Sequence, residues 1–208
     1  GASLTGTLTY SPALSSAAGE YVATCTFPGD TNHDGGSSTG TVTITRVPLV
    51  ITASSHTVSY GAPVPTITPS FAGFVNGETS AALTTQPTCS TAYTTTSNAG
   101  TTPATSCAGA TSGNYDISYV PGTVTITTIP VVVTVPDVTV PYDGGNHPTT
   151  CTVTAADGAS LTGTLTYSPA LSSAAGEYVA TCTFPGDTNH DGGSSTGTVT
   201  ITRVPLVI

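Results

Sequence analysis

Cysteine is the residue type with the clearest chemistry in this sequence, because two cysteines can join in a covalent disulfide. The five cysteines include no Cys-x-x-Cys pair, and no histidine stands near them at the spacing that zinc sites use. We therefore expect disulfides, which point to an oxidising, extracellular compartment. Metal binding is the alternative. The five residues are Cys25, Cys89, Cys107, Cys151 and Cys182.

A long internal repeat indicates which cysteines pair. Residues 1–51 and 158–208 are identical, so the period is 157 residues, from 158 back to 1. Cys182 is the copy of Cys25, whereas the counterpart of Cys151 would fall before residue 1. We interpret the chain as a window onto a longer array in which truncation leaves Cys25 unpaired, although an engineered tandem would read the same way. The pairs that this predicts are Cys89–Cys107 and Cys151–Cys182.

A short acidic segment, present in both copies, is the second candidate site. In residues 30–35, oxygen-bearing side chains occupy alternate positions and Gly is sixth, as in the first half of a calcium loop. The twelfth position is Thr41, so the usual bidentate Glu is missing, and Asp, Asn and Gly are also common in β-turns. We expect a plain turn, with a stiffening calcium ion as the alternative. The candidate ligands are Asp30, Asn32, Asp34, Asp187, Asn189 and Asp191.

Catalytic patterns are weak. Residues 36–40 and their copy 193–197 fit G-x-S-x-G, but a nucleophile elbow needs a strand before the serine and a helix after it. Here a turn precedes and a strand follows, so we interpret both segments as loops. His56 and His147 have no companion ligand nearby in the sequence. We expect no enzyme activity and no cofactor other than the possible calcium.

The composition excludes some partners. Charged residues make up 6% of the chain, against roughly 25% in an ordinary soluble domain, and the net charge is −9. An acidic chain repels nucleic acid and anionic membrane surfaces. No apolar run approaches the roughly 20 residues of a membrane span. We therefore expect neither a nucleic-acid partner nor a membrane span in this segment.

Alternation of apolar residues with threonine predicts an all-β fold. In residues 40–45, 122–127 and 197–202, Val and Ile take one face of a strand and Thr takes the other. No sustained helical period is present, and residues 78–83 allow one helical turn at most. Strands are predicted near residues 131–135, 150–155, 163–167, 177–184 and 197–202.

Proline-containing junctions set the predicted domain boundaries. Pro48, Pro130 and Pro205 each follow an alternating strand and precede a further apolar segment. Junctions this short cannot act as flexible tethers, so small Ig-like β-sandwich domains in tandem would form a semi-rigid rod. The predicted domains are 1–47, the C-terminal part of an Ig-like domain; 48–129, complete; 130–205, complete; and 206–208, the start of the next.

Several motifs in order carry a family resemblance. Residues 60–63, 73–78, 113–115 and 119–126 read YGAP, GFVNGE, GNY and YVPGTVTI, and together they resemble the bacterial MBG family of Ig-like repeats, in its Tyr-Gly type. The resemblance covers nearly all of residues 49–128. Residues 130–205 resemble a related bacterial Ig-like repeat. The resemblance implies β-sandwich modules in large secreted or surface-attached bacterial proteins, commonly adhesin stalks, and it supplies no catalytic residues.

The expected function is structural. We expect a repeat of a bacterial extracellular or cell-surface protein that acts as a stalk or fibre body and spaces other domains. Its partners would be neighbouring identical repeats, and like chains if it forms a fibre. The alternatives are a self-assembling extracellular filament subunit, in which another chain completes the half domain 1–47, and an adhesive module that binds glycan or protein through its loops.

Overall fold

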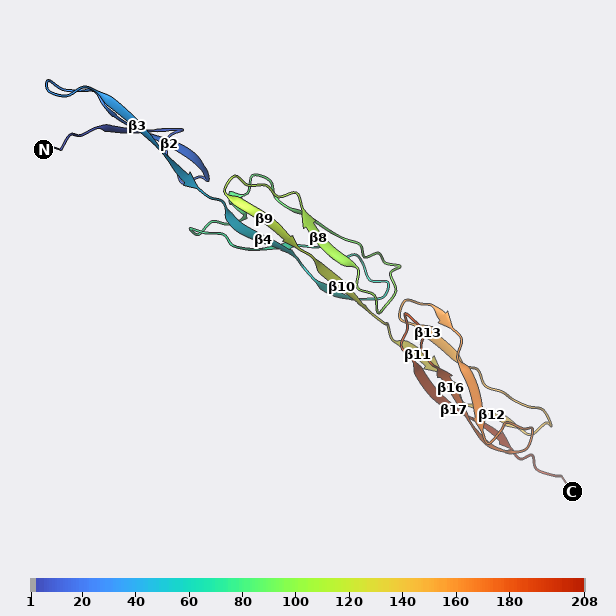
Figure 1. The fold of residues 1–208 in the computed structure, drawn as a ribbon. Helices are drawn as coiled ribbons and strands as arrows, with labels where there is room; N and C mark the ends of the chain where they lie inside the picture. The colour runs from blue at the N-terminus through green and yellow to red at the C-terminus, as the bar shows by residue number, and fades with distance from the viewer. Residues whose placement is uncertain (1–2, 208) are drawn as a thin grey trace. The chain divides into compact units, whose positions relative to one another are not determined.

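The structure is a computed structural model that describes residues 3–207 (Figure 1). It confirms the all-β prediction: over this range the elements are β-strands and one 3-10 turn, η1 (Ser80–Ala82). The turn falls inside the segment for which the sequence allows one helical turn. No helix in residues 3–207 is both long and apolar enough to span a bilayer.

Two compact units make up the chain, and each draws on separate stretches of sequence. The first combines the residues up to Ser54 with Thr66–Thr91 and Thr105–Gly122. The second combines Ser55–Pro65 and Ala92–Ala104 with the residues from Thr123 onward. The predicted domain 48–129 contributes strands to both units, and the predicted domain boundaries stay a prediction.

In the first unit, the first copy of the repeat forms an antiparallel sheet in the order β1-β2-β3. The Thr/Val/Ile alternation gives these strands one apolar and one hydroxyl face. The structure corrects one prediction: Gly36–Gly40 and its copy Gly193–Gly197 are not loops but the starts of strands. Every residue from Gly36 to Ile44 pairs with β2, and the copy pairs in the same way. The strands are β1 (Thr7–Ser11), β2 (Gly19–Phe27) and β3 (Gly36–Ile44).

A second sheet of the first unit has β4 at its centre. This strand pairs antiparallel with β6 and parallel with β9. Its apolar face, with Leu49 and Ile51 fully buried, packs against the disulfide-linked strand pair β7–β8. The strands are β4 (Val47–Ala53), β6 (Pro69–Ala72), β7 (Thr88–Thr91), β8 (Ala104–Ala108) and β9 (Tyr115–Val120).

The second unit begins with a parallel strand pair, β5 (His56–Ser59) and β10 (Gly122–Thr127). Val124 and Ile126 of β10 are buried against the ring of Tyr93. The hydroxyl of Tyr93 donates a 2.6 Å hydrogen bond to the carbonyl of Ala62, so the buried ring keeps a polar partner.

A complete β-sandwich fills the rest of the second unit. One sheet has the order β11-β13-β14 and the other the order β12-β17-β16-β15. The predicted strands of this region are present, and the sequence did not predict β12, which pairs parallel with β17. The strands are β11 (Val131–Thr134), β12 (Val138–Pro141), β13 (Thr152–Ala155), β14 (Ser160–Leu161), β15 (Thr164–Ser168), β16 (Gly176–Phe184) and β17 (Gly193–Thr202).

Candidate functional site at the module junctions

The acidic loop of the second copy, Asp187–Gly192, folds as a turn held by its own first residue. One carboxylate oxygen of Asp187 accepts hydrogen bonds from the backbone N–H groups of Asn189 and His190, each at 2.8 Å. Aspartate favours this arrangement because its short side chain reaches the backbone two and three residues on. The loop therefore has the plain-turn geometry that the sequence predicts.

His190 fixes the loop against its surroundings. Its Nδ1 lies 2.8 Å from both carboxylate oxygens of Asp187, and the residue is only 9% exposed. Its Nε2 is buried without a hydrogen bond and lies 3.6 Å from the carboxylate of Asp157. The ring of Tyr60 meets the imidazole edge-on, with centroids 5.9 Å apart. One histidine thus contacts three separate segments of the unit.

The contacts between His190 and Asp187 shift the pKa values of both side chains. Hydrogen bonding to Asp187 raises the pKa of His190 above its ordinary value, and Asp157 adds to the effect, although burial opposes it. The backbone N–H of Asn189 and then the side chain of His190 lower the pKa of Asp187. The loop therefore favours a protonated imidazole beside an ionised carboxylate.

Backbone hydrogen bonds join the loop to the chain just before Pro130, where a domain boundary is predicted. The N–H of Ile129 donates to the carbonyl of Asn189 at 3.0 Å, and the N–H of Asp191 donates to the carbonyl of Ile129 at 2.8 Å. The hydroxyl of Thr128 also donates to the carboxylate of Asp191. These bonds hold the junction segment against the loop instead of leaving it as a free linker.

The side chain of Asn189 reaches further, to the turn at Asn98–Ala99. Its Oδ1 accepts a hydrogen bond from the backbone N–H of Ala99 at 3.0 Å, and its Nδ2 lies 3.3 Å from Oδ1 of Asn98. Ala99 is buried, so this N–H would have little access to water without Asn189. The loop therefore makes contacts on both sides of the predicted boundary.

Comparing the acidic loop in the two copies distinguishes hydrogen bonds within the loop from contacts that the loop makes at the junction. Asp30 makes the same internal bonds, to the N–H groups of Asn32 and His33 and to Nδ1 of His33, all at 2.8 Å. Here both Asn32 and His33 are exposed. The turn is therefore a property of the segment itself, and the contacts of Asn189 and His190 are a property of the junction.

A second junction lies in the first unit, around Asn114. The side-chain Oδ1 of Asn114 accepts a hydrogen bond from the N–H of Ala18 at 2.9 Å, and its carbonyl accepts one from the N–H of Val47 at 3.0 Å. Arg46 lies 3.7 Å from the carboxylate of Asp116, an exposed ion pair. Here too an asparagine in a turn bonds to residues on the other side of a predicted boundary.

Tyr115, next to this asparagine, anchors the adjoining turn. Its hydroxyl donates a 2.5 Å hydrogen bond to the carboxylate of Glu78 and accepts one of 3.2 Å from the N–H of Val75. The bond to Glu78 raises the pKa of Tyr115 above its ordinary value, so the phenol stays protonated.

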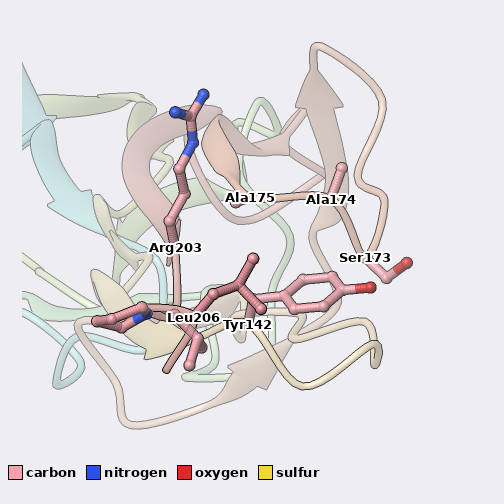
Figure 2. Close-up of a pocket in the computed structure, with 8 residues that line it drawn as sticks. Tyr142, Ser173, Ala174, Ala175, Arg203 and Leu206 are labelled. Atoms are coloured by element: carbon pink, nitrogen blue, oxygen red, sulfur yellow. The ribbon is translucent and has the colours of Figure 1, made fainter. Parts of the chain in front are cut away.

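A hollow of about 740 Å³ lies at the C-terminal end of the second unit (Figure 2). Leu206, on its wall, is 90% exposed, whereas its copy Leu49 is fully buried in β4. The copies of Ala175 and Val204 are Ala18 and Val47, which bond to Asn114 at the other junction. The hollow therefore corresponds to the junction surface of the first unit. Its lining residues are Tyr142, Ser173, Ala174, Ala175, Arg203, Val204, Pro205 and Leu206.

The cysteines take the partners named from the repeat. Cys89 bonds to Cys107, with Cα atoms 4.0 Å apart, across paired strands β7 and β8. Cys151 bonds to Cys182, with Cα atoms 5.6 Å apart, and so ties the segment before β13 to β16 of the opposite sheet. Cys25 is a free, exposed thiol on β2.

The six candidate calcium ligands stay a prediction. In each copy the first Asp is engaged by backbone N–H groups, and Asp191 bonds to Thr128. Within residues 3–207, no cluster of three or more His, Cys, Asp or Glu side chains is arranged to hold a metal ion. His147 lies 2.8 Å from Asp143 in an exposed turn.

Sequence reasoning missed the junction role of four residues: Tyr60, Asn98, Asn114 and Asp157. Their contacts with the loop and with Ala18 join positions far apart in the sequence, which periodicity does not reveal. Two features of the sequence point toward these contacts. Tyr60 and Asn114 lie inside the motifs that carry the family resemblance, and Asn189, the partner of Asn98, lies inside the acidic loop.

Comparison with known proteins identifies one segment. Residues 49–125 match the family model described as MBG domain (YGX type), which covers less than half of the 208 residues. No curated protein matches the chain. Among solved structures, the crystal structure of Drosophila N-cadherin EC1-4 matches at 10% identity and a TM-score of 0.27, over 88% of this chain and 58% of that chain. At that score the likeness supports no inference.

Proposed function

We propose that this chain is part of the body of an extracellular, surface-displayed bacterial protein, in which Ig-like modules are joined end to end to extend and space other domains. Residues 49–125 supply an MBG module, and 130–205 supply a second Ig-like repeat, of which residues 158–205 recur at 1–48. The role is mechanical: a short junction, held by hydrogen bonds, restricts the orientation of each module relative to the next.

The observation that carries this proposal is the set of bonds around Ile129. The junction residue exchanges two backbone hydrogen bonds with the loop of the following module, and Asn189 of that loop bonds to Ala99 of the preceding segment. A flexible tether between independent binding modules has no need of such contacts. A spacer needs them, because the stiffness of an array depends on its weakest connection.

Two disulfides support the extracellular assignment. Such bonds persist in oxidising compartments and are rare in the cytosol. They also suit small modules, since a covalent cross-link offsets the limited stability of a small core.

The dependence of size on repeat number tests the proposal. We would prepare chains of one, two, three and four 157-residue periods and measure their radii of gyration by small-angle X-ray scattering. A stiff array predicts a radius that grows in proportion to the number of periods. Growth with roughly the square root of that number is the behaviour of flexibly linked modules and would contradict the spacer role.

A matched variant makes this test specific to the junction. A chain with Asn189→Ala and His190→Gln in every period should lose the linear growth, whereas changes on the outer face of a sheet, such as Glu177→Gln, should not. If neither variant alters the growth, the junction bonds do not supply the stiffness.

A further inference from the structure

In the MBG module, the first and the last stretches of chain pair with each other and run in the same direction. In the first unit, β4 pairs parallel with β9 over six residue pairs, with residues 47–52 opposite 115–120. In the second unit, β5 pairs parallel with β10 over four residue pairs, with residues 56–59 opposite 124–127. The beginning and the end of this module are therefore joined directly by strand pairing.

A further backbone hydrogen bond stands at each end of this parallel pairing. At its start, the N–H of Val47 donates to the carbonyl of Asn114 at 3.0 Å. At its end, the N–H of Tyr60 donates to the carbonyl of Thr127 at 2.8 Å. Leu49 of β4 is fully buried, so the core shields one side of the pairing from water, and hydrogen bonds are stronger where the local dielectric is low.

The Ig-like repeat at 130–205 has the same arrangement on a smaller scale. Its strand β12 pairs parallel with its last strand, β17, over four residue pairs, and the N–H of Tyr142 extends the pairing with a 2.9 Å bond to the carbonyl of Thr202. The hydroxyl of Thr202 donates to the carbonyl of Val140 at 3.3 Å. Thr127 of β10 makes the matching bond to the carbonyl of Val58, also at 3.3 Å. The two kinds of module therefore join their ends in the same way.

Parallel terminal strands respond to tension along the chain in a particular way. Tension enters through the N-terminal end of the first strand and leaves through the C-terminal end of the last strand. Because the two strands run in the same direction, the pull draws them past each other along their axes, and the row of hydrogen bonds between them carries the force together. Strands that are pulled apart from one end lose their bonds one after another. The parallel geometry therefore slows unfolding under tension, and it is the unfolding rate that governs forced unfolding.

We propose that the parallel pairs β4–β9, β5–β10 and β12–β17 are clamps through which each module carries tension along the chain. This role rests on the proposed function and adds to it, because a spacer needs stiffness but does not need to resist pulling. The clamp of the MBG module has six and four residue pairs, whereas that of the Ig-like repeat has four. The MBG module should therefore be the stronger of the two.

The direction of pull tests the clamp without changing its residues. In a full-length Cys25→Ser chain, optical tweezers hold the MBG module through DNA handles on two introduced cysteines at exposed positions. Handles at Thr45→Cys and Thr127→Cys pull opposite ends of the parallel pair, whereas handles at Thr45→Cys and Gly113→Cys pull both strands from the same end. We expect the first geometry to need at least about twofold more force at the same loading rate, because its hydrogen bonds are loaded together. Equal forces in the two geometries would overturn the proposal.

Disulfide reduction identifies which module unfolds when the chain is pulled from its two ends. An intact disulfide keeps the residues that it encloses from extending. Reduction should lengthen the MBG event by about 65 Å, because Cys89 and Cys107 are 18 positions apart, and the Ig-like event by about 110 Å, because Cys151 and Cys182 are 31 positions apart. We expect the MBG event at the higher force. An Ig-like repeat that outlasts the MBG module would contradict the order set by clamp length.

Proline variants test a single bond of the smaller clamp. The N–H of Tyr142 donates to β17, and alternate residues of a strand direct their N–H groups to the same side. The N–H of Val140 therefore faces β17, whereas Thr139 and the native Pro141 stand on the free edge of β12. Because proline has no N–H, Val140→Pro should lower the unfolding force of the Ig-like repeat by about a quarter relative to Val140→Ala, which loses only packing. Thr139→Pro should leave the force unchanged.

Equal forces for Val140→Pro and Val140→Ala, or an equal loss in Thr139→Pro, would overturn the clamp in this module. The scattering and pulling experiments together separate the clamp from the spacer role. A radius of gyration that grows linearly, combined with equal forces in the two pulling geometries, would overturn the clamp and leave the spacer role standing. Growth with the square root of the number of periods, combined with a higher force for the opposite-end handles, would support the clamp and contradict the stiffness.

Discussion

The side-chain Oδ1 of Asn189 lies 3.0 Å from the backbone nitrogen of Ala99 and accepts its hydrogen bond. Ninety residues of sequence separate the two positions, and the predicted domain boundary at Pro130 lies between them. The copy of Asn189, Asn32, is exposed in an identical turn. The asparagine of this turn therefore bonds to Ala99 at position 189, and its copy at position 32 makes no such contact. Asn32 can thus serve as a control for Asn189.

Replacing Asn189 with alanine should destabilise the junction. The change leaves the buried N–H of Ala99 without its partner, which costs about 1 to 3 kcal/mol. Hydrogen exchange followed by NMR should show the amide of Ala99 losing protection. Asn32→Ala in the same chain serves as the control and should change stability by less than about 0.5 kcal/mol, as exposed substitutions usually do. Equal effects of the two changes would contradict a junction role.

Junction stability should depend on pH through His190 and Asp187. Because the pKa of His190 is raised from 6.5 by Asp187, its contribution is full below pH 6.5 and is lost as the pH rises through the raised value. Because the pKa of Asp187 is lowered from 3.8, its contribution is present above pH 3.8 and is lost as the pH falls through the lowered value. Stability should therefore be highest between these limits.

The pH dependence is checked by thermal unfolding from pH 3 to pH 9 with the native chain and two variants. His190→Gln should remove most of the decline above pH 6.5, because the imidazole that titrates beside Asp187 and Asp157 is gone. Asn32→Ala, at the exposed copy of the loop, removes no titrating group and serves as the control, so the shape of the profile should not change. A decline above pH 6.5 that persists in full after His190→Gln would refute this assignment.

Removing the disulfide between the sheets should be the most damaging covalent change. Cys151 and Cys182 are 31 positions apart, so losing their bond with Cys151→Ser and Cys182→Ser should cost about 4 kcal/mol by chain entropy. Cys89 and Cys107, 18 apart, should cost about 3 kcal/mol. Urea unfolding with and without each pair measures both losses. A smaller loss for the wider pair would contradict this order.

The local pattern of apolar and polar residues predicted most of the strands, whereas the features that it did not predict depend on long-range contacts. Alternation of Thr with Val and Ile was enough to predict strands such as β10 and β17, and the repeat offset named the cysteine pairs. The parallel pairing of β12 with β17 was not predicted, because nothing in a four-residue segment specifies a partner 61 positions away. The position of Gly36–Gly40 between a turn and a strand predicts a loop, but its pairing with β2 makes it part of the strand.

In the candidate site, too, the local structure could be predicted from the sequence and the long-range contacts could not. The acidic loop was found from its composition, and its turn geometry follows from the Asp187 side chain alone. Its contacts with Tyr60 and Ala99 depend on how distant segments pack, which neither charge nor periodicity encodes.

Distance distributions across the Ile129 junction test the central claim most directly. Spin labels at the exposed positions Thr95 and Thr164, introduced as cysteines in a Cys25→Ser chain, lie on either side of this junction within the second unit. Pulsed electron paramagnetic resonance should give one narrow distance distribution, which broadens when Asn189→Ala and His190→Gln are added. A distribution that is already broad in the native junction would show that the bonds around Ile129 do not hold the modules, and would contradict the spacer function.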